Sequence, residues 1–204
     1  MPTGFGARIL YILQNYRFSF LKGAGVTMAI AVISTAFGCL IGFAVGIVQS
    51  LPIGKNDSLP KKVFLKAVRF LLGAYVEVFR GTPMMVQSMF IYYGIPLIFG
   101  IHLDMWPAAL LIVSINTGAY MAETVRGGIL SIDVGQTEGA KAIGMTHFQT
   151  MVNVILPQAL RNIIPQIGNN LIINIKDTCV LSVIGTIELF YTTKGIAGEY
   201  YTYF

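Results

Sequence analysis

The sequence predicts an all-α integral membrane protein, a polytopic helical bundle, and three observations support this fold class. Hydrophobic residues make up 55% of the 204 residues and charged residues only 11%, while the mean hydropathy is +0.70. A soluble domain carries about 25% charged residues. Uncharged runs long enough to cross a bilayer alternate with polar loops, and the loop over residues 51–66 is rich in lysine.

The first 22 residues are predicted to be an amphipathic segment that approaches the membrane, and residues 23–204 to be a single transmembrane domain. Aromatic residues are spread through the first segment, as is typical of a membrane interface. From Gly23 to Ser50 there is no charged residue, so this stretch is the first predicted span. Three glycines spaced four apart give it a small-residue stripe that lets another helix approach closely: Gly38, Gly42 and Gly46.

The second hydrophobic region continues to about Phe99 and is predicted to break near its middle. Its first half holds Arg69, Glu77 and Arg80, and the latter two are spaced to form an intrahelical ion pair. Its second half is uncharged. Between the halves, Pro83 removes a backbone donor and disfavours helix at Thr82, so we expect a helix break at these two residues.

Two further spans complete the four that the hydrophobic pattern shows. Met105–Ala122 provides 18 uncharged residues, a minimal span. The last region runs from Asn162 to Ile187 but is interrupted by Lys176 and Asp177, so it either carries an ion pair at depth or breaks around these residues. Loop charges favour segments 51–66 and 124–160 inside, with both termini and 94–105 outside. Basic residues before the first span oppose that absolute orientation.

Sequence motifs for catalysis, nucleotide binding and metal binding are absent. The chain has no G-x-x-x-x-G-K-[ST], H-E-x-x-H, C-x-x-C or G-x-S-x-G, so we expect no enzymatic activity and no bound ATP on this chain. Cys39 and Cys179 lie in apolar runs and are expected to be small buried hydrophobes. The net charge of +5 fits basic loops, because no basic stripe with interleaved aromatics indicates nucleic acid.

Polar residues within or beside the spans are the candidates for a substrate pathway. Asn116, Tyr120 and Glu123 are spaced i, i+4 and i+7, which places them on one helical face. Glu123 could instead pair with Arg126, three residues on. Lys176 and Asp177 point about 100° apart on a helix, so each needs a separate partner, an unwound backbone or a substrate.

A polar, helix-forming insert over about residues 131–157 separates the third and fourth spans, and its Leu156-Pro157 pair is predicted to stop a helix. Within 138-EGAKAIGMTHFQTMVNVILP-157, one set of residues matches the cytoplasmic coupling motif of ABC-importer permeases in type and spacing: Glu138, Ala140, Gly144, Leu156 and Pro157. Gly139 stands where the motif has alanine and Val154 where isoleucine is usual. Gly139 should weaken the helix somewhat.

The chain as a whole, from about residue 21 to 190, resembles the polar amino-acid permease branch of type I ABC importers. The runs that carry this resemblance are 80-RGTPMMVQ-87, 117-TGAYMAETVRGGI-129, 135-GQTEGAKAIG-144, 156-LPQALRNIIP-165 and 176-KDTCVLSVIG-185. The resemblance implies a multi-pass permease in a bacterial plasma membrane. Branch members usually have a fifth core span, and the chain ends at 198-GEYYTYF-204 with no apolar run left for it, so we expect either a truncated sequence, which we favour, or an absent last helix.

The resemblance also implies partners and residue roles. Two cytoplasmic ATPase subunits, which hold the ATP and magnesium, a second identical or homologous permease chain and an extracytoplasmic amino-acid-binding protein would complete the complex. Glu138, Gly139, Ala140, Gly144, Leu156 and Pro157 would couple the chain to the ATPase. Asn116, Tyr120, Glu123, Asp177 and Thr178 are the candidates for the substrate pathway.

Two other functions fit parts of the sequence. An ion-gradient-driven transporter could use Glu123 and Asp177 as cation sites, although the coupling motif disfavours it. A non-transporting membrane scaffold needs no polar stripe at all. We expect the permease function, in which the insert is polar because it leaves the membrane to meet an ATPase.

Overall fold

The computed structural model describes residues 4–51 and 58–200, which form helices and no strand. The longer helices are α1 (Phe5–Ser50), α2 (Leu59–Gly81), α5 (Met105–Leu130), α8 (Leu156–Asp177) and α9 (Leu189–Glu199). The shorter ones are α3 (Met84–Met89), α4 (Ile95–Phe99), α6 (Val134–Ala142) and α7 (His147–Thr150). Two π-helical turns, η1 (Phe90–Gly94) and η2 (Met151–Ile155), and a 3₁₀ helix, η3 (Thr178–Ile184), join them.

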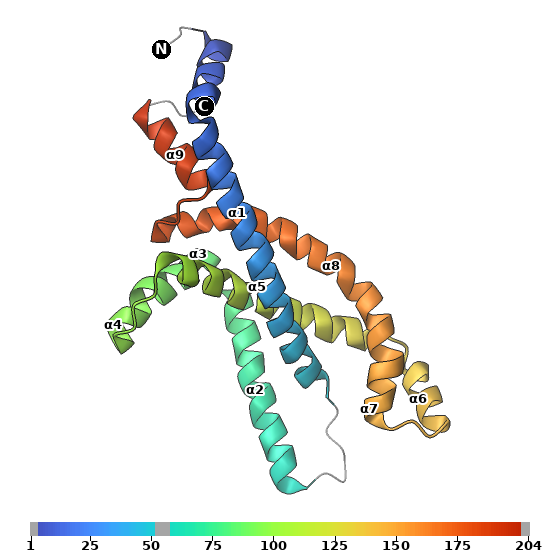
Figure 1. Cartoon of the computed structure of the whole chain (residues 1–204). Coiled ribbons are helices and arrows are strands. Elements are labelled where there is room, and N and C mark those ends of the chain that lie inside the picture. Colours follow the sequence, from blue (N-terminus) through green and yellow to red (C-terminus); the bar gives the residue numbers. More distant parts are fainter. Residues whose placement is uncertain (1–3, 52–57, 201–204) are drawn as a thin grey trace.

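Helix α1 runs unbroken through the boundary at residue 22, so the described part of the predicted N-terminal segment is continuous with the first span. No proline interrupts these 46 residues, whose length of roughly 69 Å exceeds the ~30 Å hydrocarbon thickness. Figure 1 shows α9 lying beside the first half of α1. There the Tyr16 hydroxyl donates to the Glu199 carboxylate at 2.9 Å.

The glycine stripe of α1 packs directly on α5, as its spacing predicts. A Cβ added at Gly38 would lie 2.5 Å from Cβ of Thr117, and one added at Gly46 would lie 2.7 Å from the Ala122 carbonyl oxygen. A Cβ at Gly42 would collide with Met121. Helix α5 is the centre of the bundle, because it packs on α1, α2 and α8.

Within the described residues, two helices are long and apolar enough to cross a membrane: α1, over Gly6–Ser50, and α5. The segment His147–Ile184 together with Leu189–Glu199, bent by 57°, makes a third if counted as one broken span. The prediction of four spans is therefore too high by this criterion. The second region fails it because the break divides a charged α2 from the shorter apolar segment Met84–Phe99.

The prediction that Leu156-Pro157 stops a helix is wrong. Pro157 lies in the first turn of α8, where a missing N–H costs nothing, and the chain stays helical from His147 to Ile184. The wide turn η2 ends just before it, where the Leu156 N–H donates to the Met151 carbonyl five residues back. In the same way, turn η1 ends just before Ile95-Pro96, and the Ile95 N–H donates to the Phe90 carbonyl five residues back.

The insert and the lysine-rich start of α2 lie at the same end of the molecule (Figure 1). Helix α9 and the start of α1 lie at the other end. This arrangement agrees with the relative alternation of loops that the sequence predicts. Lys55 belongs to that basic loop but lies outside the described residues.

The close approach of α1 and α5 predicts that the same change, glycine to alanine, lowers the free energy of unfolding at one position of α1 and raises it at another. Gly42→Ala should lower the free energy of unfolding by ~1–3 kcal/mol, because the added methyl group overpacks the contact with Met121. Gly25→Ala, at an exposed position of α1 with open space around it, should raise it by up to ~1 kcal/mol through helix propensity. Thermal unfolding in detergent measures both. Equal shifts would contradict the packing role of Gly42.

Candidate functional site

A polar cavity of about 280 Å³ lies where the α2–α3 break, α5 and α8 meet. It brings together predicted residues from two groups, the helix break and the pathway candidates: Thr82, Pro83, Asn116, Tyr120 and Asp177. Met84, Thr117, Asn170, Ile173 and Asn174 complete its lining. The cavity is at the lower end of the ~300–1,000 Å³ that small-molecule pockets occupy.

The break at Thr82 and Pro83 is held by Gln87, a residue that the sequence analysis did not single out. The Gln87 amide nitrogen donates to the carbonyl oxygens of Phe79 and Thr82, both at 2.9 Å. Its amide oxygen accepts from Asn116 at 2.9 Å. Gln87 thus satisfies carbonyls that the interrupted helix leaves without partners and fixes the orientation of Asn116.

Asn174 ties three helices together beside the cavity. Its amide nitrogen donates to the Thr35 hydroxyl on α1 at 2.8 Å, and its oxygen accepts from the Thr117 hydroxyl on α5 at 3.1 Å. All three side chains are buried. Buried polar groups with such partners are rigid and specific in geometry.

Asp177 is the one residue with a carboxylate or basic group among the cavity-lining residues, and it is the last residue of α8. No ion pair joins it or Lys176 to any residue in the described ranges. Lys176 is exposed and Thr178 is buried, but neither lines the cavity. The Thr178 hydroxyl donates instead to the Ile175 carbonyl at 2.9 Å. The sequence left two alternatives for Lys176 and Asp177, an ion pair at depth or a break of the helix. The described residues contain no such ion pair, and α8 changes into the 3₁₀ helix η3 directly after Asp177.

The sequence analysis missed Asn170 and Asn174 although a signal for them was present. Together with Asp177 they are spaced i, i+4 and i+7, the same spacing that identified the polar face of α5. Both asparagines are buried. The polar face of α8 lines the same cavity as Asn116 and Tyr120 of the α5 face.

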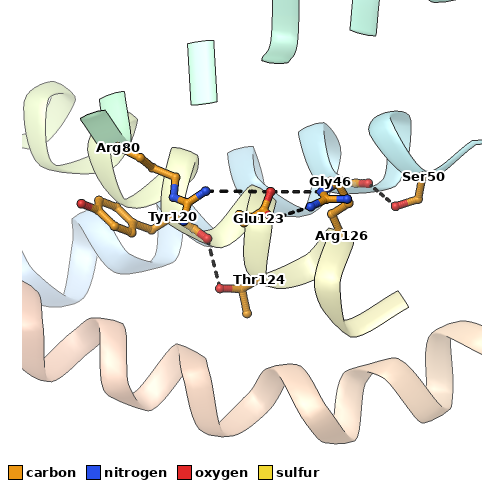
Figure 2. A network of polar contacts seen from close by, with 7 residues as sticks. All are labelled: Gly46, Ser50, Arg80, Tyr120, Glu123, Thr124 and Arg126. Atoms are coloured by element: carbon orange, nitrogen blue, oxygen red, sulfur yellow. Dashed lines mark hydrogen bonds and ion pairs between the residues drawn. The ribbon is translucent and has the colours of Figure 1, made fainter. Parts of the chain in front are cut away.

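Glu123 lies outside the cavity lining and is held by two arginines (Figure 2). Arg126 makes two hydrogen bonds to it, one of them 3.0 Å from Nε, which is the pairing left open as an alternative to a pathway role. Arg80 forms a longer ion pair of 3.9 Å with it from α2 and lies 5.7 Å from the Tyr120 ring centroid. The ion-pair partner of Arg80 is thus Glu123, whereas the sequence predicted Glu77.

The insert folds as two short helices with well-defined ends. Asp133 caps α6 by accepting from the Gly135 N–H at 2.7 Å. Gly144 ends it with φ of +85°, and the Gly144 and Met145 N–H groups donate to the carbonyls of Lys141 and Ala140. These bonds form a Schellman motif, which favours glycine. Thr146 and Gln149 make a capping box that starts α7.

The motif residues of the insert differ in exposure. Ala140 is buried within the insert, Leu156 is half-buried, and Glu138, Gly139 and Pro157 are exposed. Two large apolar side chains near the turn, Ile143 and Phe148, are 79% and 75% exposed. A polar segment with exposed apolar side chains at its tip presents a surface suited to a protein partner. No cluster of three or more histidine, cysteine or acidic side chains suited to a metal occurs in the described ranges.

The fold is that of an ABC transporter permease. A crystal structure described as an amino acid ABC transporter with histidines matches 100% of this chain and 87% of its own, with a TM-score of 0.83 and 32% identity. An inward-facing structure of the MetNI methionine ABC transporter matches 91% of this chain and 82% of its own, with a TM-score of 0.71 and 22% identity, which shows the fold alone.

The sequence comparisons define the family. Residues 61–203 match the family of binding-protein-dependent transport system inner membrane components, and the chain belongs to it. The glutamine transport system permease protein GlnP of Escherichia coli K12 is 39% identical over 88% of this chain and 78% of its own length. A putative glutamine permease of Rickettsia conorii is 34% identical over 95% of this chain and 84% of its own length. The chain is thus a permease subunit of an ABC transporter.

The Gln87 network predicts a stability cost at the helix break. Gln87→Met should lower the free energy of unfolding by ~1–3 kcal/mol, because the Thr82 carbonyl loses its Gln87 donor and Asn116 loses its Gln87 acceptor, while the Phe79 carbonyl keeps only the longer 3.3 Å bond from Asn116. Denaturation of the purified permease in detergent provides the measurement. The matched control is Gln14→Met on the exposed face of α1, which should change stability by less than ~0.5 kcal/mol. Equal stability of the two variants would contradict this role.

Proposed function

We propose that this chain forms the translocation pathway for a polar amino acid in an ATP-driven importer, with substrate bound in the cavity between the α2–α3 break, α5 and α8. The cavity lining carries this proposal. It contains three carboxamides, three hydroxyl groups and one carboxylate: Asn116, Asn170 and Asn174, then Thr82, Thr117 and Tyr120, then Asp177. Such a lining offers donors and acceptors to a zwitterion with a polar side chain.

Asp177 is the proposed contact for the substrate's ammonium group. It is half-buried, no described residue neutralises it by an ion pair, and no lysine or arginine lines the cavity. A carboxylate in such a place favours a cationic partner. Among polar amino acids we propose one with an uncharged amide side chain. The amide nitrogens of Asn116 and Asn170 donate within the protein, so their amide oxygens are the groups that can accept from a substrate carboxamide, and two relatives are named for glutamine.

The proposed partners follow from the insert and from the relatives. A pair of cytoplasmic ATPase subunits would bind ATP and magnesium and receive the α6–α7 insert, with Ile143 and Phe148 entering a groove on the ATPase. A second permease chain and an extracytoplasmic amino-acid-binding protein would complete the complex. We place the assembly in the inner membrane of a bacterium, because the family description names inner membrane components and the relative of Escherichia coli is bacterial.

Movement of the insert would reach the cavity through the two helices that flank it. Helix α5 carries Asn116 and Tyr120 and ends at Leu130, four residues before α6. Helix α8 continues from α7 without a gap and carries Asn170 and Asn174. Both walls of the cavity are thus rigidly joined to the insert, and a shift of the insert would change their separation. Such rigid-body motion is one means of alternating access.

The substrate proposal is tested at Asp177. Asp177→Asn should raise the KM for uptake of glutamine by roughly tenfold or more, because a charge-assisted hydrogen bond to the ammonium group is lost. Radiolabelled uptake into proteoliposomes that contain the complete transporter measures it. Asp104→Asn is the matched control, since Asp104 precedes α5 and lies outside the cavity lining. An unchanged KM in the Asp177 variant would refute the assignment.

The energy source is tested in the same vesicles. Uptake should stop when ATP is exhausted, whatever ion gradient is imposed across the membrane. Uptake that persists on an ion gradient alone would instead support a secondary transporter.

The role of the insert in coupling to the ATPase is tested by the same glycine-to-alanine change at two of its positions. Gly144→Ala should weaken co-purification of the ATPase subunit by roughly fivefold, because alanine at a positive φ costs ~1–2 kcal/mol and distorts the turn. Gly139→Ala should leave it unchanged or strengthen it. Gly139 is exposed with open space around it, and alanine favours the helix. If the two variants bind the ATPase equally, the turn is not part of the contact.

A further inference from the structure

The N-terminal half of α2 stands apart from the bundle. Its C-terminal half packs on α1 and α5 through Leu72, Tyr75 and Val76, and the Tyr75 hydroxyl donates to the Ile115 carbonyl at 2.6 Å. None of residues 59–71 is buried. Figure 1 shows this half extending past the end of α1, toward the end of the molecule that holds the insert.

This half-helix has two different stripes side by side. Lys62, Lys66 and Arg69 are spaced i, i+4 and i+7 and form a basic stripe. The apolar stripe consists of Val63, Phe64, Phe70 and Leu71. Val63 and Phe70 follow a basic position by one residue and lie on the adjoining face, whereas Phe64 and Leu71 follow by two and extend the stripe to the opposite face. The Phe64 and Phe70 side chains are 67% and 75% exposed.

Two members of the basic stripe, Lys66 and Arg69, can still bind an anion. Neither Lys66 nor Arg69 forms an ion pair with a residue in the described ranges. The Arg69 Nε is shielded from solvent yet has no hydrogen-bond acceptor. An anion from outside the chain can reach only the exposed part of this guanidinium group. A second copy of this surface is excluded as occupant because its charge would be of the same sign.

From this combination we propose that the N-terminal half of α2 binds the headgroup of an anionic phospholipid in the leaflet on the side of the insert. Phe64, Phe70 and the neighbouring aliphatic side chains enter the acyl region. Lys66 and Arg69 contact the phosphate of the lipid. Basic residues beside exposed aromatic and aliphatic ones are the composition that anionic membrane surfaces attract. The inference stands on α2 and is independent of the identity of the substrate.

Lipid retention tests the proposal. The complete transporter is placed in nanodiscs of phosphatidylcholine mixed with phosphatidylglycerol, and the phosphatidylglycerol that stays bound is measured by native mass spectrometry. Each of Lys66→Gln and Arg69→Gln should weaken retention roughly fivefold, and added salt should weaken it in the unaltered protein. Lys194→Gln, an exposed position on α9 at the other end, should change nothing.

Two results would overturn the proposal. One is a double variant, altered at both Lys66 and Arg69, that retains as much phosphatidylglycerol as the unaltered transporter. The other is unchanged lipid retention accompanied by loss of the ATPase subunit, which would assign the basic stripe to a protein partner. Both variants replace half-buried or exposed helix positions with a good helix former, so the fold is preserved.

Discussion

The backbone contact between α1 and α5 fixes the positions on which the rest of the structure depends. Lipid provides no hydrophobic force between helices, so close packing of small residues has to hold them together. At Gly38 the two helices are so close that only a hydrogen atom fits against Thr117. This closeness lets the hydroxyls of Thr35 and Thr117 reach Asn174 from two helices at once. A glycine stripe with no chemistry of its own thus positions the polar groups of the cavity wall.

The charges of the chain are divided between two tasks. Glu123 is shared by Arg126 and Arg80, so it clamps α5 to the end of α2 and retains little attraction for another cation. Asp177 has no such partner within the described ranges, and it lines the cavity. From the sequence alone, Glu123 and Asp177 were equal candidates for a contact with the substrate. Their surroundings separate a structural carboxylate from one that is available to a ligand, because an anion already paired with two guanidinium groups gains little from a third cation.

Sequence periodicity was sufficient for much of the fold and for part of the site. The glycine stripe, the break at Thr82 and Pro83 and the polar face of α5 all follow from residue type and spacing, which are local properties. The π-helical turn before Pro157 does not, because a wider turn lets the helix pass a proline that would otherwise end it. The partner of Arg80 could not be predicted from local spacing either, because Glu123 is 43 residues away and is brought to Arg80 only by the packing of α2 on α5. Asn170 and Asn174 were predictable from their spacing with Asp177 and were overlooked because they lie in an uncharged run.

The helix break at Pro83 and the change from α to 3₁₀ helix at Thr178 act in a way that hydropathy alone does not reveal. Broken membrane helices can offer their unpaired backbone groups to a ligand. Here the chain takes those groups for itself. Gln87 donates to the carbonyls freed before Pro83, and the Thr178 hydroxyl donates to the Ile175 carbonyl where α8 becomes 3₁₀. What remains open to a ligand is therefore a set of side-chain groups, the Asp177 carboxylate and the amide oxygens of Asn116 and Asn170. Specificity in such a cavity resides in residue identity, so related permeases can change substrate by exchanging a few side chains while the broken backbone stays the same.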